Sequence, residues 1–530
     1  MEKTIRGYHE RTKHHFNRFA KSAGQLDWAT QPEPFRRFEG ARLVALPRDF
    51  ETEPVDFDEL YSATGRAPAE LAIETISDFL FHSLAISAWK AMGEVKWELR
   101  VNPSSGNLHP TEGYLVLPAV EGISDAAGVF HYAPKEHGLE ERCRLTVAAG
   151  KKLFAGLPDG AFLFGLSSVC WREAWKYGER AFRYCQHDTG HAIAALTFAA
   201  GLFGWRVRVL GGWPQRSVDA LLGVDRVDDF PVSEEREEGE TLLLVSPGPC
   251  DADVTPVAPK AGWAGVANRL SIDHHPWPVI DEAAAATRHP GGVDHESPTP
   301  LIHLDVSGRG KDARTILRQR RSGVAFDGKS GVHVERFVRI LTRCLPGPHP
   351  PFLSLPWAPT VHLALFVHRV DDLAPGIYLL VREPAAESRL REAMRDDFTW
   401  ERPSEVPEEL PLFRLALGDC QELAEQLSCG QEIAGSSFFS LGMIADFAGP
   451  IAEHGDWFWR RLFWEAGMVG QVLYLEAEVE GARGTGIGCY FDDPVHELLG
   501  LAGEEFQSLY HFTVGIPVED TRLTTLPAYD

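Results

Sequence analysis

Two long apolar stretches have the length and composition of buried helices. Residues 192–203 are apolar and rich in alanine, residues 469–480 are similar, and each stretch ends close to a glycine, where helices often stop. A short β-forming run follows each (207–210 and 486–490), then a Val-x-x-Leu-Leu-Gly turn of helix, then a closing apolar strand (241–245 and 510–514). The pattern predicts the same series of elements twice.

The two series keep one register. His187-Asp-Thr-Gly190 aligns with Trp464-Glu-Ala-Gly467, and Val218 aligns with Val495; 467 minus 190 and 495 minus 218 are each 277, with no gap needed between them. A period this long indicates two related domains and not a stack of small repeats. Upstream, strand-like segments at 113–117 and 128–132 resemble those at 361–367 and 376–381.

Helices and strands therefore mix within each half, and we expect an α+β fold of two domains. Residues 247–300 are rich in Pro, Gly, Ala, Asp and His and show only one short helical pattern, near 280–287. The sequence predicts an N-terminal domain at 1–248, a connector at 249–300 that wraps over the surface, and a C-terminal domain at 301–530.

Composition restricts the possible partners. The chain has 530 residues, of which 44% are hydrophobic and 24% charged, which is typical of a globular protein. Its net charge of -24 argues against binding nucleic acid or anionic membranes, so a phosphate-bearing ligand needs a local basic cluster. No apolar run is long enough for a membrane span, and the first residues do not resemble a signal peptide.

The cysteines and histidines do not predict a metal site. The eight cysteines form no C-x-x-C or C-x-x-H pair, which favours reduced thiols and a cytoplasmic location. The pairs His14-His15 and His274-His275 are adjacent in sequence, and adjacent side chains point apart on a helix or strand.

Two motifs carry candidate chemistry. Arg320-Arg321-Ser322 ends a helical run that begins near Ala313, and its guanidinium groups and hydroxyl suit a phosphate; a solvated basic helix end is the structural alternative. Residues 103–110, Pro-Ser-Ser-Gly-Asn-Leu-His-Pro, supply hydroxyls, an amide and free backbone N–H groups at a tight bend before a strand. An ordinary loop is the alternative for this segment.

Taken together, these motifs resemble those of the FMN-dependent nitroreductase superfamily. The stretches at 8–13, 103–110 and 176–184 most resemble SagB/ThcOx-type dehydrogenases, in a tandem, two-domain form. In that family two subunits swap elements and each flavin lies at their interface. The resemblance therefore implies two nitroreductase-like domains in tandem that form an intrachain pseudo-dimer.

The resemblance also nominates cofactor-binding residues. Arg320 and Ser322 match the contacts to the phosphate and ribityl chain, and Gly488 falls where the backbone approaches the ring. Arg522 falls where a C-terminal basic residue meets the phosphate, whereas Val324 stands where the family often has a basic residue. The loop across the isoalloxazine ring is matched by Pro103, Ser104, Ser105 and Asn107.

Neither motif recurs in the other half. Residues 82–89 lack an Arg-x-Ser, and residues 355–360 stand near the place of the Pro-Ser-Ser-Gly-Asn loop. We therefore expect one FMN per chain and a degenerate second site.

By resemblance, Lys176 and Tyr177 are catalytic candidates. Desaturation needs a base, and the charge of a lysine is expected to lower the pKa of a neighbouring phenol. A surface lysine beside a packing tyrosine is the structural alternative. For Arg183, an ion pair with Glu179 at i,i+4 spacing is the expectation.

The function implied is an FMN-dependent oxidoreductase that oxidises a peptide-derived or other biosynthetic intermediate, with azoline-to-azole oxidation as one such reaction. The alternatives are an NAD(P)H-dependent nitro- or quinone reductase, and a non-catalytic flavin-fold scaffold in a biosynthetic complex. The expected partners are a small-molecule or peptide substrate and biosynthetic enzymes, with no nucleic acid or membrane. The chain is expected to act as a monomeric pseudo-dimer or as a higher homo-oligomer.

Overall fold

The computed structural model describes residues 4–50, 53–62, 66–259, 262–292, 306 and 308–529. It contains two large sheets. The first runs in the order β2 (Arg42–Ala45), β7 (Gly138–Arg144), β6 (Gly128–Ala133), β5 (Thr111–Leu117), β8 (Phe162–Ser168), β10 (Glu238–Ser246) and β9 (Arg206–Val209). The second runs β16 (Leu412–Leu417), β15 (Gly376–Leu380), β13 (Val361–Val367), β17 (Phe439–Asp446), β19 (Phe506–Gly515) and β18 (Arg483–Ile487).

The two sheets have the same strand order once the edge strand β2 is set aside. Every pairing in them is antiparallel, as an α+β fold requires. The central strands β5, β8 and β13 are buried along their whole length, because helices and loops cover both faces of each sheet. The repeat read from the sequence therefore corresponds to a repeat of topology.

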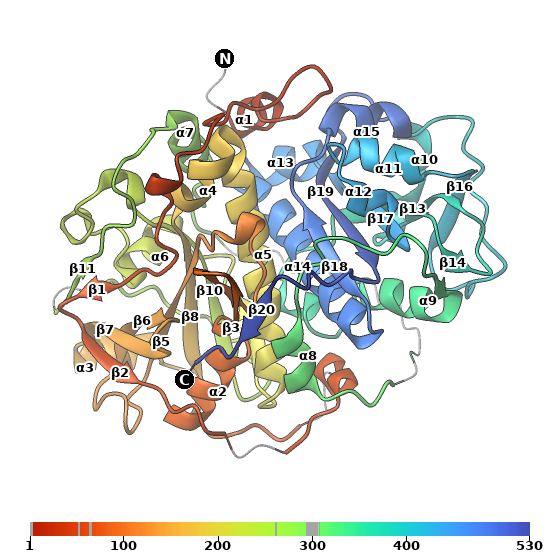
Figure 1. The fold of residues 1–530 in the computed structure, drawn as a ribbon. Coiled ribbons are helices and arrows are strands. Elements are labelled where there is room, and N and C mark those ends of the chain that lie inside the picture. Colours follow the sequence, from red (N-terminus) through yellow and green to blue (C-terminus); the bar gives the residue numbers. More distant parts are fainter. Residues whose placement is uncertain are drawn as a thin grey trace.

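Two long helices, α5 (Ala181–Gly201) and α14 (Phe458–Val479), lie between the sheets and pack against each other (Figure 1). Their contact is reciprocal. A Cβ on Gly190 would lie 2.2 Å from the carbonyl oxygen of Trp464, and a Cβ on Gly467 would lie 2.2 Å from that of His187. Both pairs are related by the 277-residue offset, as in a two-fold symmetric interface. The glycines recur because only glycine allows the backbones to approach this closely.

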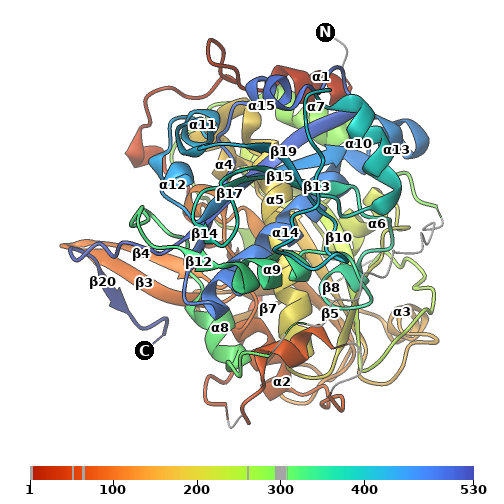
Figure 2. The ribbon, with the colours of Figure 1, turned by 90° about the vertical axis from the view of Figure 1, so that its right-hand side faces the viewer.

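The C-terminal segment crosses to the first half. Strand β20 (Thr524–Leu526) pairs with β3 (Ile86–Met92), which pairs with β4 (Val95–Arg100). This three-stranded sheet extends from the body of the protein, with the C-terminus beside it (Figure 2). Segments more than 400 residues apart in sequence are thereby joined.

The smaller elements complete the layers around the sheets. The remaining strands are β1 (Phe38–Glu39), β11 (Val266–Ala267), β12 (Val332–His333) and β14 (Val370–Asp371). The remaining helices are α1 (Ile5–Arg11), α2 (Ile73–Phe81), α3 (Val147–Leu153), α4 (Cys170–Tyr177), α6 (Gln215–Leu222), α7 (Pro278–Ala286), α8 (Ala313–Gln319), α9 (Val334–Arg343), α10 (Glu387–Ala393), α11 (Gln421–Leu427), α12 (Glu432–Gly435), α13 (Ala448–His454) and α15 (Asp492–Leu499).

The expected elements of the repeat are present, with longer helices than the sequence indicated. The short strand expected at 486–490 is the exception, because it lies at Arg483–Ile487. The short helix of the connector is α7, and the connector also contributes β11, which pairs with β1. The boundary expected between residues 300 and 301 lies outside the described residues. None of the helices described is long and apolar enough to cross a bilayer.

Candidate functional site

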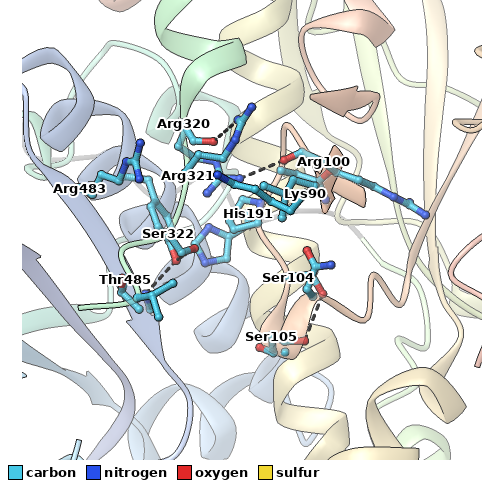
Figure 3. A pocket seen from close by; sticks show the side chains of 18 of the residues that line it. Lys90, Arg100, Ser104, Ser105, His191, Arg320, Arg321, Ser322, Arg483 and Thr485 are labelled. Carbon is cyan, nitrogen blue, oxygen red and sulfur yellow. Dashed lines mark hydrogen bonds between the residues drawn. The ribbon is translucent and has the colours of Figure 1, made fainter. Parts of the chain in front are cut away.

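Both sequence motifs line one cavity of about 350 Å³, a volume within the usual range for cofactor and ligand pockets. The loop 103–107 connects β4 to β5 and forms one side, and residues 320–322, directly after α8, form the other (Figure 3). Strand β18 adds Thr485 and Gly486, and helix α5 adds Asp188 and His191. Residues from both halves of the chain therefore enclose the cavity.

The loop 103–107 is held in a fixed conformation. Gly106 and Asn107 both have positive φ values, of 60° and 59°, a conformation that glycine and asparagine adopt more readily than other residues. The Asn107 Nδ2 atom donates to the carbonyl oxygen of Glu98 at 2.8 Å, and the backbone N–H of His109 donates to Ser104 Oγ at 2.8 Å. These bonds shape the loop before any ligand binds.

Arg320 joins the two sides of the cavity. Its Nε and Nη2 atoms donate to the carbonyl oxygens of Val101 and Arg100 at 2.9 and 3.0 Å, although these residues belong to the other half of the chain. Its Nη1 atom is buried and has no hydrogen-bond partner among the described residues. Beside it, Ser322 Oγ lies 3.0 Å from the hydroxyl of Tyr474. A cavity-lining arginine that keeps one guanidinium nitrogen unpaired among the described residues is suited to an anionic ligand.

The cavity is basic in a chain that is strongly acidic. The cationic lining residues (Lys90, Arg100, Arg320, Arg321 and Arg483) outnumber the acidic ones (Asp188, Glu519 and Asp520). Burial, followed by the charges of Arg320 and Arg318, lowers the pKa of Arg321 to about 10. Neighbouring guanidinium groups that repel each other in a partly dry site favour the binding of a polyanion. The residues present therefore fit the phosphate-bearing cofactor that the sequence predicted.

Beneath the loop lies a pair of buried carboxyl groups that the two motifs do not include. Asp188 Oδ1 accepts from the backbone N–H and hydroxyl of Ser105 at 3.2 and 3.4 Å, and Glu173 Oε1 lies 3.5 Å from Ser104 Oγ. Burial raises the pKa of Asp188 to about 7, opposed by the hydrogen bonds from the serines. Burial, then the charge of Asp188, raises the pKa of Glu173 well above its usual value.

The two carboxyl groups share at most one negative charge near neutral pH. Asp188 has the better hydrogen bonds, so it ionises first and Glu173 keeps its proton. The second oxygen of each carboxyl group is buried and without a partner among the described residues. An acidic residue at position 188, matched by Glu465 at the same place in the repeat, is the sequence signal that could have indicated this pair.

Lys176 and Tyr177, at the end of α4, lie behind the loop and are not among the residues that line the cavity. A Cβ on Gly106 would lie 2.6 Å from the Tyr177 hydroxyl and 3.1 Å from Lys176 Nζ. The expected lowering of the phenol's pKa is wrong. Burial raises the pKa of Tyr177 well above its usual value, and the negative charge carried by the nearby Glu173–Asp188 pair raises it further.

Two nominated cofactor residues lie away from the lining. Gly486, in β18, lines the cavity, whereas Gly488, just after the strand, does not; the Gly488 carbonyl accepts from the Tyr184 hydroxyl at 3.2 Å. Arg522 is exposed and pairs with Asp520, whereas Asp520 and Leu523 line the cavity. Val324 also lines it, at the position where the family often has a basic residue.

The expected pair of Arg183 with Glu179 is not formed. Glu179 lies in a short 3₁₀ turn (Gly178–Arg180) before α5, so it is not on the same helix face as Arg183. Instead, Arg183 pairs with Asp492 at 2.8 Å, and Glu179 pairs with Arg11.

Comparison with known proteins agrees with this geometry. Residues 47–233 match the nitroreductase family model. This segment includes the loop, the carboxyl pair and Lys176-Tyr177, and it is about a third of the chain.

Two relatives extend the comparison. A candidate nitroreductase of Methanocaldococcus jannaschii is 23% identical over 168 residues, which are 31% of this chain and 78% of that protein. The crystal structure of a candidate nitroreductase from Anabaena variabilis superimposes with a TM-score of 0.71 at 20% identity, covering 97% of this chain and 99% of that one. The fold of the whole chain, both sheets included, is therefore shared with that protein.

Proposed function

We propose that this chain is an FMN-dependent oxidoreductase with one flavin site between two nitroreductase-like halves. The observation that carries the proposal is the single cavity of about 350 Å³ lined by both motifs, in which a buried arginine nitrogen has no partner among the described residues. The match of residues 47–233 to the nitroreductase family supports it.

Several residues would hold the cofactor. Arg320, Arg321 and Lys90 supply positive charge for the phosphate, and the hydroxyls of Ser322 and Thr485 line the cavity beside them. On the opposite side, residues 103–107 present polar groups to the edge of a flat ring. When bound, FMN would supply the hydride acceptor. The protein would bind the cofactor, orient the substrate and transfer protons.

We infer that the second site is degenerate, because both motifs are missing there and the segments at their places make packing and ion-pair contacts. Trp357, from the segment that stands in place of the loop, is buried and packs with Trp464 and Phe458 at centroid distances of 6.2 and 6.5 Å. At residues 82–89, His82 Nδ1 pairs with Asp78 at 2.7 Å instead of facing a cavity. Two further cavities have volumes of about 30 and 10 Å³, and residues 82–89 and 355–360 line neither of them.

Proton transfer during substrate oxidation needs a base near the flavin, and Asp188 is the best-placed candidate. It lines the cavity, its Oδ2 atom has no hydrogen-bond partner among the described residues, and its pKa of about 7 suits a general base at neutral pH. Lys176 and Tyr177 lie directly behind Gly106, so a catalytic role for them requires that substrate reach that side of the loop.

The reaction class comes from the resemblance to SagB/ThcOx-type dehydrogenases. We propose a tandem form of that type, which oxidises a peptide-derived or similar biosynthetic intermediate, with azoline-to-azole oxidation as one such reaction. The substrate would enter beside Lys90, Trp97 and Leu99 of the β3–β4 hairpin, which line the cavity and are partly exposed.

The test is to purify the protein and measure FMN released per chain. We expect a ratio near one, falling at least tenfold in Arg320→Lys, because lysine keeps the charge but cannot form the guanidinium's two bonds to the other half. Asn107→Ala is expected to lower FMN content through loss of the bond to Glu98. Thr360→Val is the control in the second half, where Thr360 Oγ1 donates to Glu465 at 2.7 Å, and its FMN content should stay unchanged.

Other outcomes separate the alternatives. A ratio near two, or equal loss in Thr360→Val, would refute the one-site proposal. Absence of flavin together with an unchanged melting temperature on adding FMN would favour the scaffold. Rapid bleaching of the flavin by NADPH without another substrate would favour the nitro- or quinone reductase.

A further inference from the structure

A cluster of two cysteines and a histidine lies outside the cavity, next to the strand that lines it. Cys489 follows β18, and Cys429 lies in the loop between α11 and α12. Their Sγ atoms are 3.0 Å apart, and His14 Nδ1 is 3.9 Å from Cys489 Sγ. Both cysteines are half-buried, so a small reagent can reach them. No sequence motif indicates this cluster, since its members are 415 and 60 residues apart.

The backbone brings the two cysteines together without help from the sulfur atoms. The N–H of Phe491 donates to the carbonyl oxygen of Leu427 at 2.8 Å, and Gln431 Nε2 donates to the carbonyl oxygen of Cys489 at 3.0 Å. Cys429 itself has a φ of 57°, which is uncommon for a residue other than glycine and is often found at functional sites. A disulfide requires the sulfur atoms to approach by only about 1 Å.

The two thiols have different surroundings. The hydrogen bond from Cys429, with smaller contributions from His14 and Arg180, lowers the pKa of Cys489 to about 5. The same hydrogen bond, together with burial, raises the pKa of Cys429 far above its usual value. One proton is thus shared by the pair, with Cys489 as the thiolate and Cys429 as the thiol.

We propose that Cys489 and Cys429 form a peroxide-sensitive dithiol, with Cys489 as the sulfur that is attacked by oxidant and Cys429 as the resolving sulfur. A low-pKa thiolate that is accessible and lies next to a second thiol is the arrangement found in redox-sensing cysteines. A disulfide would link Cys489, which is three residues after Gly486 and just beyond β18, to the loop between α11 and α12.

The chemistry takes two steps. The Cys489 thiolate attacks one oxygen of a hydroperoxide, so an S–O bond forms, the O–O bond breaks, and the alkoxide or hydroxide leaves and takes a proton from water. The Cys429 sulfur then attacks the sulfenic sulfur, so the S–S bond forms, the S–O bond breaks, and hydroxide leaves with the Cys429 proton as water. The two thiols lose two electrons, and the peroxide gains two.

A second pair of neighbouring cysteines, one of them buried, serves as a comparison. Cys170 and Cys185 also interact with each other, and Cys170 is half-buried. There, however, burial, the neighbouring Cys170 and the charges of Glu173 and Glu240 raise the pKa of Cys185 well above its usual value. Cys185 is therefore held as a thiol, and we expect this pair to react slowly.

The experiment exposes the reduced full-length protein to hydrogen peroxide and follows each cysteine by peptide mass spectrometry. We expect Cys429–Cys489 to lose two hydrogens, reversibly with dithiothreitol, at least ten times faster than Cys170–Cys185 reacts. Cys429→Ser should stop at a sulfenic acid on Cys489 that dimedone traps. Cys489→Ser should leave Cys429 reduced over the same time.

The inference is independent of the proposed function, because the oxidant is added and the readout is thiol mass. The same result is expected in the Arg320→Lys variant, whether or not flavin is bound. Equal oxidation of both pairs would overturn the proposal, as would a Cys429→Ser protein that forms no dimedone adduct. One zinc ion per purified chain, lost in Cys489→Ser, would overturn it in favour of a metal site at His14, Cys429 and Cys489.

Discussion

Replacing Asp188 with asparagine should remove a pH-dependent loss of stability. In the native protein burial raises the pKa of Asp188 from 3.8 to about 7, so the folded state holds a proton that the unfolded chain releases at lower pH. A carboxyl group with a raised native pKa stabilises the fold most below its unfolded pKa. That contribution is lost as the pH rises through the native pKa, and the asparagine of the variant would not titrate.

The magnitude follows from the size of the shift. About three pKa units correspond to roughly 4 kcal/mol in total, and the two units between pH 5 and 7 to roughly 3 kcal/mol. Asparagine keeps an oxygen that can accept from Ser105, so the loop should stay in place. The free energy of unfolding of Asp188→Asn should therefore gain about 3 kcal/mol relative to the wild type between roughly pH 5 and 8.

The assay is urea unfolding at several pH values with excess FMN, for the wild type, Asp188→Asn and the control Asp219→Asn. Asp219 is also buried, and its pKa is raised to about 6, but it lies on α6 away from the cavity. For Asp219→Asn, the pH dependence of the free energy of unfolding should differ from that of the wild type mainly below pH 6. If the wild type and Asp188→Asn lose stability in parallel between pH 6 and 8, the assignment of a neutral Asp188 is refuted.

Two further substitutions test the structure itself. Gly190→Ala would place a methyl group 2.2 Å from the backbone of Trp464, so we expect it to lower the free energy of unfolding, measured in urea, by about 1–3 kcal/mol. The control is Gly201→Ala in the same helix. Its Cβ would lie 3.2 Å from the flexible end of a leucine side chain, so its effect should be nearly neutral. Asp492→Asn leaves the buried Arg180 and Arg183 without their carboxylate and should lower the free energy of unfolding by about 3–5 kcal/mol. Asp397→Asn, at the exposed pair with Arg395, should have no measurable effect. Equal effects in either pair of variants would contradict the packing described.

The sequence predicted what depends on local pattern and on repetition. The apolar runs indicated α5 and α14, and the 277-residue offset indicated two equivalent halves, because burial imposes the same periodicity on both copies. The sequence also placed residues 103–107 and 320–322 in one site through their resemblance to a family. Those features need no knowledge of distant contacts.

Features that depend on contacts between distant segments were missed. The pairing of β20 with β3, the partners of Asp492 and the Cys429–Cys489 pair all join segments that no local pattern connects. The i,i+4 rule failed at Glu179 because a 3₁₀ turn at Gly178–Arg180 interrupts the helix between it and Arg183. The prediction of a lowered Tyr177 pKa was wrong for a similar reason, since burial and the nearby acidic pair outweigh one adjacent lysine.

The two halves show which parts of the repeat serve the fold and which serve the site. Gly190 and Gly467 are both kept, because each is needed where the two central helices cross. At the neighbouring position the halves differ. Glu465 is paired with Arg382 and accepts from Thr360, so its charge is neutralised within the core, whereas Asp188 accepts from serines and lines the cavity. The same place in the repeat is therefore tied into the core in one half and lines the cavity in the other, which is the asymmetry that the proposed single flavin site requires.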